Sequence, residues 1–468
     1  MIALDNTLTE QLTDEFYRHT QPAPVKKPRL LAFNHQLAQF LSLETSELSD
    51  DALARLFSGV QIPQSATPVA MAYAGHQFGQ FVPQLGDGRA VLLGNSIATD
   101  GLSYDIQLKG SGQTEFSRNG DGKSALGPVL REYLMSEAMF NLGVPTTRSL
   151  AAVDTNEQVY RQNGPEPRGI FTRVARTHIR IGTFEYFASR QKVEQLKLLA
   201  DFVIKHLYPA CAKQDNPYLG LFRLVSENIL NLVAKWQGIG FIHGVMNTDN
   251  MSLAGETIDY GPCAFMDTFE ANKKFSAIDR GGRYAYNQQP GIAQWNLSIF
   301  ASCLVPLVDE DEQKSIALLQ HEMSRLTEVY QSAWLGAFRA KLGLFNELPE
   351  DKAMIKHVLS EFEQQGIDFT TGFRDLTATP NKLLSDRHSS QPQSAAEVRE
   401  CMEQHNPWLI PRNHHLEQAI NEAYQGNFEL FNRLQLAYKE PYVVNHEYAD
   451  LACAPRPEQL VRRTFCGT

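Results

Sequence analysis

The sequence predicts an α+β protein in which a small sheet comes first and a larger helical part follows. Short apolar or alternating runs bounded by glycine and aspartate occur from about residue 66 to residue 185, as is typical of strands. Later segments are too long for strands and carry apolar residues three and four apart, which is the helical period. No internal repeat is present, which argues against a solenoid. We therefore expect one large folded unit.

Composition argues against several classes of protein. Hydrophobic residues make up 43% of the 468 residues and charged residues 21%, which is ordinary globular usage. The net charge of −10 disfavours a general binder of nucleic acid, which needs a dense basic surface. The N-terminal stretch lacks a basic start and an apolar run, and no window approaches ~18 uninterrupted apolar residues. We therefore expect a cytoplasmic protein with neither a nucleic-acid nor a membrane partner. Because no heptad run indicates a coiled-coil interface, we also expect a monomer.

Four regions follow from the pattern. Residues 1–65 hold short helix candidates broken by the stretch PAPVKKP and are expected to form an N-terminal helical extension. Residues 66–185 are expected to form a sheet with one helix, and residues 186–308 a helical part that carries two polar loops. Residues 309–468 are expected to form a C-terminal helical region with a cysteine-containing tail, interrupted by a polar, turn-rich stretch at 376–396.

The sheet region can be taken element by element. AVLLGNSIA and YDIQLKGSG follow the loop LGDGR and predict paired strands. GPVLREYLMSEAMFNLGV predicts a helix that begins near Pro128 and ends at Gly143, because its apolar residues keep the helical period. RGIFTRVA, from Arg168 to Ala175, predicts the next strand.

The helical part begins with two long amphipathic segments, KVEQLKLLADFVIKHLY and LFRLVSENILNLVAKWQGIG. Two polar stretches follow, HGVMNTDNMSL and ETIDYGP. Strand-like runs from Met251 to Leu253 and from Thr257 to Asp259 predict a small hairpin that carries both loops. Such a hairpin would bring their polar side chains close together.

These polar and glycine residues fall in the order of a protein kinase: a Gly-rich turn, a strand lysine, a helix glutamate, then an asparagine and an aspartate for divalent metal. LGDGR supplies Gly86, Gly88 and Arg89. Glycine lets backbone N–H groups approach phosphate, and Arg89 adds a cation. The alternative interpretation of the same residues is a tight hairpin turn followed by an exposed arginine.

Lys109 ends a predicted strand and could neutralise phosphate as a point charge. Its carboxylate partner would be Glu132 or Glu137, which are five apart on the following helix, so that only one can face it readily; Glu132 is favoured. Asp121 and Gly122 lie between them in a second Gly-rich loop, SRNGDGKS, which fits a ligand contact or a polar turn.

Three arginines follow in FTRVARTHIRIG. Arg173, Arg176 and Arg180 lie on a predicted strand and its continuation, where guanidinium groups could form a cationic wall for a triphosphate. Ordinary surface arginines would explain one of them more comfortably than all three.

The stretch HGVMNTDN is the most informative. Kinase catalytic loops read H-R-D-L-x-x-x-N, and here His243 and Asn250 fit the first and last positions. Val245 stands where the base belongs, and an apolar side chain cannot accept a proton. Asp249 could supply the missing carboxylate, while Asp259 of DYG takes the second metal-binding position with Asn250. An Asx turn would explain TDN alone, but not TDN together with DYG.

At this point the sequence resembles the selenoprotein O family of kinase-like proteins, once regarded as pseudokinases because of the missing base. GDGR, QLKGSGQT, REYLMSEA, GVPTTR, TRVARTHIRIGTFEYF, HGVMNTDNMS, IDYGP and the terminal FCGT all occur in the order of that family and span most of the chain. The resemblance implies a two-lobed, protein-kinase-like fold with helical additions at both ends, in which residues 66–185 bind nucleotide and residues 186–308 carry the catalytic and metal loops.

The resemblance also implies an activity: transfer of AMP from ATP to Ser, Thr or Tyr hydroxyls of protein substrates, with Mg²⁺, or Mn²⁺, as the metal. Asp249 would be the proton acceptor, and Asn250 and Asp259 would bind metal. The residues implied to contact the nucleotide are Gly86, Gly88, Arg89, Lys109, Asp121, Gly122, Arg173, Arg180 and Asp259.

Two other functions remain open on the residues alone. One is an ordinary phosphotransferase in which Asp249 replaces the lost base. The other is a nucleotide-binding scaffold without activity, although Lys109, Asn250 and Asp259 are all retained. The residues do not distinguish AMP transfer from phosphoryl transfer, and they do not identify the protein substrates.

The six cysteines form no CxxC pair and no zinc-like spacing. Cys466 lies where some family members carry selenocysteine, and Cys263 follows Asp259 closely. A disulfide between these two cysteines would tie the tail across the site. The alternative is a buried Cys263 and a free Cys466, because cytoplasmic thiols are usually reduced.

Overall fold

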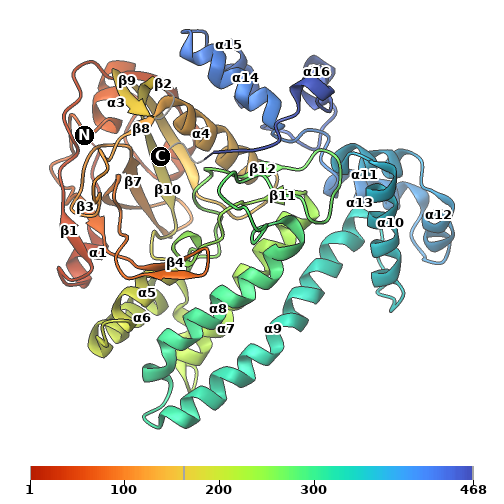
Figure 1. The fold of residues 1–468 in the computed structure, drawn as a ribbon, viewed down its shortest axis with the longest axis horizontal. Coiled ribbons are helices and arrows are strands. Elements are labelled where there is room, and N and C mark those ends of the chain that lie inside the picture. The colour runs from red at the N-terminus through yellow and green to blue at the C-terminus, as the bar shows by residue number, and fades with distance from the viewer. Residues whose placement is uncertain (1, 162–163, 466–468) are drawn as a thin grey trace.

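The computed structural model describes residues 2–161 and 164–465 and confirms a mixed α+β protein (Figure 1). A main antiparallel sheet with helices on both faces forms one part, and long helices form the other. The strands of the main sheet run in the order β1-β3-β6-β7-β10-β9-β2, and β8 pairs with β10. Their bounds are Tyr17–His19 (β1), Arg29–Phe33 (β2), Val69–Met71 (β3), Ala90–Ile97 (β6), Ser103–Lys109 (β7), Ser124–Ala125 (β8), Arg148–Arg161 (β9) and Gly164–Ala175 (β10).

The predicted sheet elements are confirmed where the pattern was strongest. β6 and β7 pair antiparallel, with Ala90 opposite Lys109, and β10 contains the predicted strand. The predicted helix between β7 and β10 is α4 (Leu126–Asn141). Gly143, just after the end of this helix, has a left-handed φ of 74°, a conformation that glycine adopts readily at helix ends. β9 has no counterpart in the prediction, and β1 and β2 show that residues 1–65 contribute strands as well as helices.

Side chains of the sheet alternate between two hydrophobic layers, as the strand period requires. Leu92 and Phe171 pack with the helix α4. Val91 and Ile170, one residue before each, pack with α2 (His35–Phe40) and α3 (Asp50–Phe57) on the other face. The sheet is therefore a buried layer, and polar side chains on it need specific partners.

The remaining helices surround and extend this layer (Figure 1). α7, α8 and α9 pack side by side, and α14 and α15 pack on α4. The bounds are Thr7–Gln11 (α1), Ile181–Ala188 (α5), Val193–Leu207 (α6), Pro217–Gly238 (α7), Gln289–Val308 (α8), Glu312–Lys341 (α9), Asp351–Gln365 (α10), Phe369–Ala378 (α11), Lys382–Ser389 (α12), Ala395–His405 (α13), Asn413–Tyr424 (α14), Glu429–Ala437 (α15) and Ala449–Ala452 (α16). α12 lies within the stretch 376–396 that was predicted to be turn-rich.

The predicted hairpin at 251–259 is wrong, because each of its runs pairs with the sheet part instead. Leu253 N donates to Ile179 O at 3.1 Å, and Thr257 N donates to Pro145 O at 2.9 Å. The small hairpin of this region is formed further out by β11 (Phe241–Ile242) and β12 (Ala264–Phe265). Both polar loops are thus fixed directly to the sheet part.

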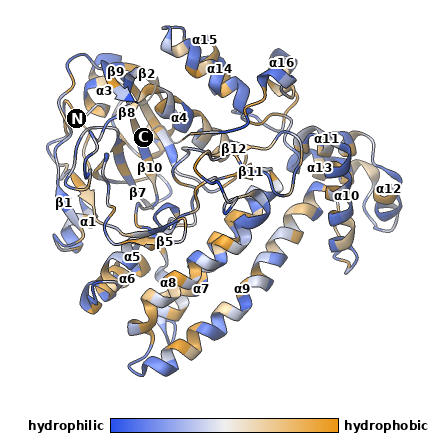
Figure 2. Cartoon of the chain, in the orientation of Figure 1, coloured by the Kyte–Doolittle hydropathy of each residue, from blue (hydrophilic) through white to orange (hydrophobic). Residues whose placement is uncertain are grey.

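One helical stretch of the described chain, Tyr286–Val308 including α8, is long and apolar enough to cross a membrane by length and composition alone. Hydrophobic residues recur along α8 and its neighbour α7 (Figure 2). Leu297, Phe300 and Leu304 on α8 are fully buried, and the helix packs against α5, α7 and α9. Interior packing therefore accounts for its apolar character.

Candidate functional site

A cavity of about 810 Å³ lies between the sheet and the two polar loops, within the size range of small-molecule sites. It brings together the predicted site residues Gly86, Gly88, Arg89, Lys109, Asp121, Gly122, Arg173, Arg180, Asp249, Asn250 and Asp259. Arg176 lies elsewhere: its Nε donates to Ser103 O at 3.1 Å, and its guanidinium lies over the ring of Tyr104. The predicted cationic wall therefore has two of its three arginines.

Lys109 ends β7 on the face covered by α4. Its Nζ donates to Glu132 Oε2 at 2.7 Å and also contacts the Asp259 carboxylate. Glu137 faces another way and accepts hydrogen bonds from Arg148, at 2.8 Å for both of its oxygens. The partner of Lys109 on α4 is therefore Glu132.

Arg173 lies beside Lys109 because β10 pairs with β7, with Phe171 opposite Lys109. Its Nη2 donates to Gln107 Oε1 at 2.6 Å, and its Nη1 is 3.8 Å from Asp259 Oδ1. Burial alone would raise the pKa of Asp259, but Lys109 and Arg173 hold it well below its usual value. The Asp259 carboxylate is therefore ionised and surrounded by cations.

Arg180 caps the N-terminus of helix α5 and reaches the first polar loop, which contains Asp249. Its Nη1 donates to the backbone oxygen of Asp249 at 2.9 Å, and its Nη2 is 3.5 Å from Asp87 Oδ1. Its guanidinium lies 4.5 Å from the ring centre of Tyr73. Burial raises the pKa of Asp87, while Arg180 lowers it. This arginine is held by protein groups on three sides at the cavity wall.

The Gly-rich turn needs its first glycine for backbone reasons. Gly86 has a φ of 75°, and a Cβ there would meet the Phe116 ring at 2.2 Å. In the second Gly-rich loop, SRNGDGKS, the Asp121 carboxylate forms an ion pair with Arg161 at 2.9 Å and accepts a hydrogen bond from Lys123 N at 3.0 Å. Asp121 therefore shapes its own loop while lining the cavity.

His243 joins the two polar loops. Its backbone N–H donates to Gln289 Oε1 at 3.0 Å, and its Nε2 donates to Ile258 O at 2.9 Å, beside Asp259. Burial lowers the pKa of His243, so the ring is neutral. Asn250 Nδ2 donates to Val245 O at 3.0 Å, which orients the amide of Asn250. The predicted kinase-like positions thus have structural roles in holding the loops.

Asp249 is buried, with 8% of its surface exposed. Burial raises the pKa of its carboxyl to about 6, and Arg180 and Gln77 oppose that shift. Oδ2 accepts a hydrogen bond from Gln77 Nε2 at 3.2 Å. Oδ1 has no partner among the described residues and faces Gly75, where a Cβ would approach it to 2.8 Å. Asp249 is thus a carboxylate with one oxygen held and one enclosed.

The sequence reasoning missed the hairpin that covers this loop, formed by β4 (Gly75–Gln77) and β5 (Gln80–Val82). His76 N donates to Thr248 Oγ1 at 2.7 Å, and Phe78 N donates to Asn247 Oδ1 at 3.1 Å. The hairpin is therefore bonded to the residues immediately before Asp249. The letters AGHQFG could have suggested a tight turn, but nothing in them indicated its target.

The hairpin is held from behind by buried polar groups. His76 Nδ1 lies 2.5 Å from Glu185 Oε1, and burial raises the pKa of this glutamate. Tyr284 donates its hydroxyl to Asn247 Oδ1 at 2.5 Å. These contacts fix the hairpin and the loop against each other, so that Gln77 is held against Asp249.

A metal ion would find few protein ligands here. Within residues 2–161 and 164–465, no group of three or more His, Cys, Asp or Glu side chains is suited to a metal. Asp259 and Asn250 line the same cavity, and Mg²⁺ commonly takes only one or two carboxylates, the rest of its ligands being water and substrate phosphates. The oxygen donors present therefore fit Mg²⁺ bound together with a nucleotide.

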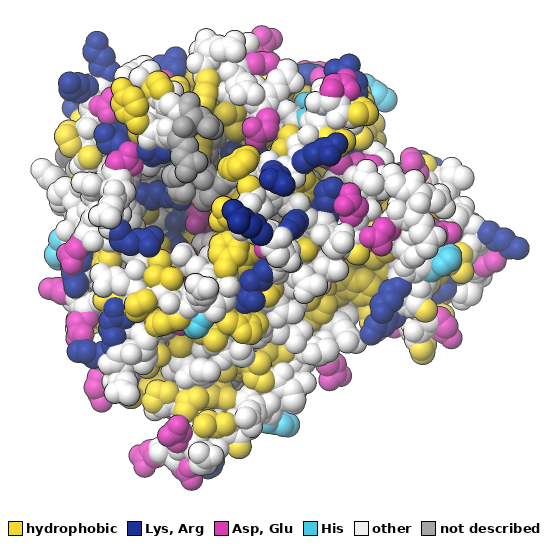
Figure 3. Space-filling view, in the orientation of Figure 1, with side chains coloured by type: hydrophobic (Ala, Val, Ile, Leu, Met, Phe, Trp, Pro, Cys, Tyr) yellow, Lys and Arg dark blue, Asp and Glu magenta, His cyan; other side chains and the backbone are white. Residues whose placement is uncertain are grey.

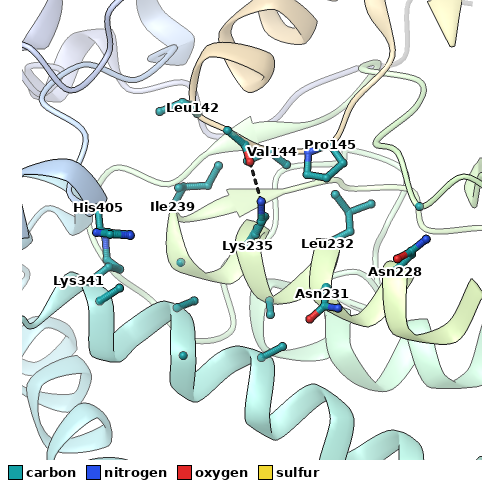
Figure 4. A pocket seen from close by; sticks show the side chains of 18 of the residues that line it. Leu142, Val144, Pro145, Asn228, Asn231, Leu232, Lys235, Ile239, Lys341 and His405 are labelled. Carbon is teal, nitrogen blue, oxygen red and sulfur yellow. Dashed lines mark hydrogen bonds between the residues drawn. The ribbon is translucent and has the colours of Figure 1, made fainter. Parts of the chain in front are cut away.

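A second cavity, of about 860 Å³, lies between α7, α9 and the turn after α4 (Figure 4). Its lining combines small apolar residues with Asn228, Asn231 and two lysines. Lys235 donates to Gly143 O at 2.8 Å. Unlike the first cavity, this one has neither an arginine nor a carboxylate in its lining, and the first is therefore the candidate site.

The described cysteines are all free thiols. Cys263 is fully buried, and burial raises the pKa of its thiol to about 12. The hypothesis of a disulfide between Cys263 and Cys466 involves a residue outside the described part of the chain.

Comparison with known proteins places the chain among enzymes that transfer nucleotides to proteins. It is 47% identical over 489 residues to the protein nucleotidyltransferase YdiU of Agrobacterium fabrum (strain C58), with 100% of both chains covered. The protein of the same name from Ruegeria sp. (strain TM1040) is 48% identical, covering 100% of this chain and 99% of the relative. The one from Bacillus cytotoxicus is 44% identical, covering 98% and 96%.

A family model described as protein adenylyltransferase SelO matches residues 3–391. The chain belongs to this family. It is an enzyme, a protein nucleotidyltransferase, and its substrates include a nucleotide and a protein.

Proposed function

We propose that this enzyme transfers AMP from ATP to Ser, Thr or Tyr hydroxyls of protein substrates, with Mg²⁺ and with release of pyrophosphate. One observation carries the proposal: a single cavity brings the cations Lys109, Arg173 and Arg180 together with the carboxylates Asp249 and Asp259. Cations suit a polyphosphate, and carboxylates suit a metal ion and an acceptor proton.

We also propose that the fold is protein-kinase-like. The pair of Lys109 with Glu132, from a sheet strand and the next helix, is the arrangement that positions phosphates in kinases. The loop from His243 to Asn250 and the loop of Asp259 then correspond to the kinase catalytic and metal loops. The departure at Val245 puts the carboxylate of Asp249 in place of the usual base.

Attack of a hydroxyl on the α-phosphorus breaks the bond to the β-phosphate, so that pyrophosphate leaves with its charge. Lys109, Arg173 and Arg180 would neutralise the nucleotide and the departing group. Asp249 would orient the acceptor hydroxyl through an oxygen and take its proton as the new phosphate ester forms. Asn250 and Asp259 would hold Mg²⁺, which, when bound, supplies further neutralisation of phosphate charge.

The test is parallel incubation of the purified protein with α-³²P-ATP and with γ-³²P-ATP, in the presence of Mg²⁺ and a reductant. Label on the enzyme or on lysate proteins from the α position alone is the expected result. Label from the γ position would instead make this a kinase with a displaced base. Label from neither would favour a nucleotide-binding scaffold. A parallel incubation with EDTA should abolish the α label.

A further inference from the structure

We propose that a basic surface beside the cavity binds an acidic segment of the protein substrate, next to the hydroxyl that is modified. This inference rests on the proposed function, because it names the chemistry of that function's protein acceptor. The surface, called here the basic rim, consists of Lys273, Lys274, Arg280, Arg283, Arg462 and Arg463.

The basic rim borders the cavity. Its first four cations lie in residues 273–283, a segment that follows the Asp259 loop. Ile278, in the middle of residues 273–283, lines the cavity itself. Arg283 lies with its guanidinium 4.7 Å from the ring centre of Trp295, and a Cβ at Gly79, at the tip of the β4–β5 hairpin, would be 3.5 Å from its Cζ. A substrate that reaches Asp249 past the hairpin therefore passes this segment.

The C-terminal tail adds the last two cations. Thr464 forms a parallel bridge with Ser276, in which Thr464 N donates to Phe275 O at 2.9 Å and Ala277 N donates to Thr464 O at 3.0 Å. Thr464 Oγ1 donates to Pro262 O at 2.5 Å. Because the bridge is parallel and pairs Ser276 with Thr464, Arg463 and Arg462 run alongside Phe275 and Lys274. Figure 3 shows Lys and Arg side chains gathered beside the hollow near the middle of this face.

Much of the rim's charge is available to a partner. Arg280, Arg462 and Arg463 are exposed, and none of the three forms an ion pair with a described residue. The one acidic residue in their first segment, Asp279, is 3% exposed and turned inward, where it accepts from Arg283 N at 2.9 Å and Tyr284 N at 2.8 Å. Lys273 is paired with Glu270 at 2.7 Å, so the positive charge that the rim offers a partner is that of Arg280, Arg462 and Arg463.

The rest of the protein sharpens this charge pattern. The chain as a whole carries a net charge of −10, so an acidic partner is repelled generally and attracted at the rim, which orients its approach. Phe81 and Ile278, 39% and 60% exposed, add apolar surface at the same place. This combination fits an acidic protein segment better than nucleic acid, which would need a longer basic surface.

The probes are two synthetic peptides of equal length with one central serine, flanked by glutamates in one and by glutamines in the other. Anisotropy measures the binding of each peptide, and α-³²P-ATP measures its modification. We expect the Glu peptide to bind roughly tenfold more tightly, and this preference to collapse at high salt, which screens exposed charges.

The variant Arg280→Glu/Arg462→Glu/Arg463→Glu should lose the preference for the Glu peptide over the Gln peptide. The KM for ATP, measured in parallel, checks that the nucleotide site is intact. Its matched control reverses three exposed cations elsewhere, Arg55, Lys356 and Lys382, changes the net charge equally, and should keep the preference. Equal behaviour of the two peptides, or of the two triple variants, overturns the inference. So does single-stranded DNA binding as tightly as the Glu peptide. Selective binding of the Glu peptide without α-label transfer keeps the rim and rejects the proposed function.

Discussion

Lys109 and Glu132 form a buried ion pair across the sheet–helix interface, with Nζ donating to Oε2 at 2.7 Å and side chains 10% and 6% exposed. The same ammonium contacts Asp259. One lysine therefore links the sheet, helix α4 and the proposed metal loop, and its position depends on carboxylates from both sides.

Glu132→Gln should lower AMP transfer by about 10²-fold or more, because Lys109 loses the anchor that holds it at the phosphates. The matched control is Glu137→Gln, five residues along the same helix. Glu137 binds Arg148 rather than Lys109, so its variant should lose stability and keep transfer. Initial rates with α-³²P-ATP, normalised by thermal unfolding curves, separate the two effects. Equal loss of transfer in both variants would contradict the assignment.

Asp249→Ala should reduce kcat for AMP transfer by about 10²-fold or more, the usual contribution of a positioned general base. Its side-chain oxygens contact Gln77 and face Gly75 rather than Lys109 or Arg173, so ATP affinity should change little. Calorimetric titration with ATP is the companion measurement. Full activity in this variant would mean that another group accepts the proton.

Gly75→Ala should impair transfer by roughly tenfold or more, because the added methyl would come within 2.8 Å of Asp249 Oδ1 and displace the hairpin. Gly336→Ala, in the interior of α9, is the control: nothing lies within 4 Å of its Cβ position. That change should stabilise the protein by up to about 1 kcal/mol and leave transfer intact. Unaltered kinetics in Gly75→Ala would show that the hairpin is free to yield.

Lys341→Met should raise the free energy of unfolding by on the order of a few kcal/mol near neutral pH. Burial lowers the pKa of Lys341 to about 7, and its Nζ faces the rings of Phe369 and Phe373. In the unfolded chain the lysine keeps its proton up to its ordinary pKa, so the native protein gains stability as pH rises from about 7 towards 10 and is penalised fully below 7.

The gain from Lys341→Met should therefore be largest at or below pH 7 and shrink as pH rises. Urea unfolding of both proteins across that range measures it. Lys356→Met, an exposed lysine on α10, serves as the control and should show little change at any pH. A gain that is constant with pH would point to packing rather than protonation.

The sequence predicted the parts of the site that sit in short motifs. Lys109, Asp249 and Asp259 could be found because each lies in a short motif, and these motifs follow one another in the order of a protein kinase. The structure brings all three residues to one cavity. Gln77 could not be found this way. It lies 172 positions before Asp249, and only the folded chain brings the two side chains together.

The fold was predictable where local pattern and tertiary packing agree. β6, β7 and α4 have strong periodicity and were anticipated. β9 was missed because its stretch DTNEQ resembles a turn, although pairing with β10 and β2 makes it the longest described strand. The runs near Met251 and Thr257 have strand-like letters, but their partners are Ile179 and Pro145 rather than each other. Non-local pairing decided each of these differences.

The two outermost strands of the main sheet, β1 and β2, both come from the first 33 residues. β2 pairs with β9, with Arg29 opposite Asp154. During translation, the segment that will become β2 is made long before its partner, and loop closure over that separation is slow. Until β9 emerges, β2 remains an unpaired strand, the type of surface that favours misassociation. The nascent chain therefore passes through an interval in which chaperone binding would protect it from aggregation.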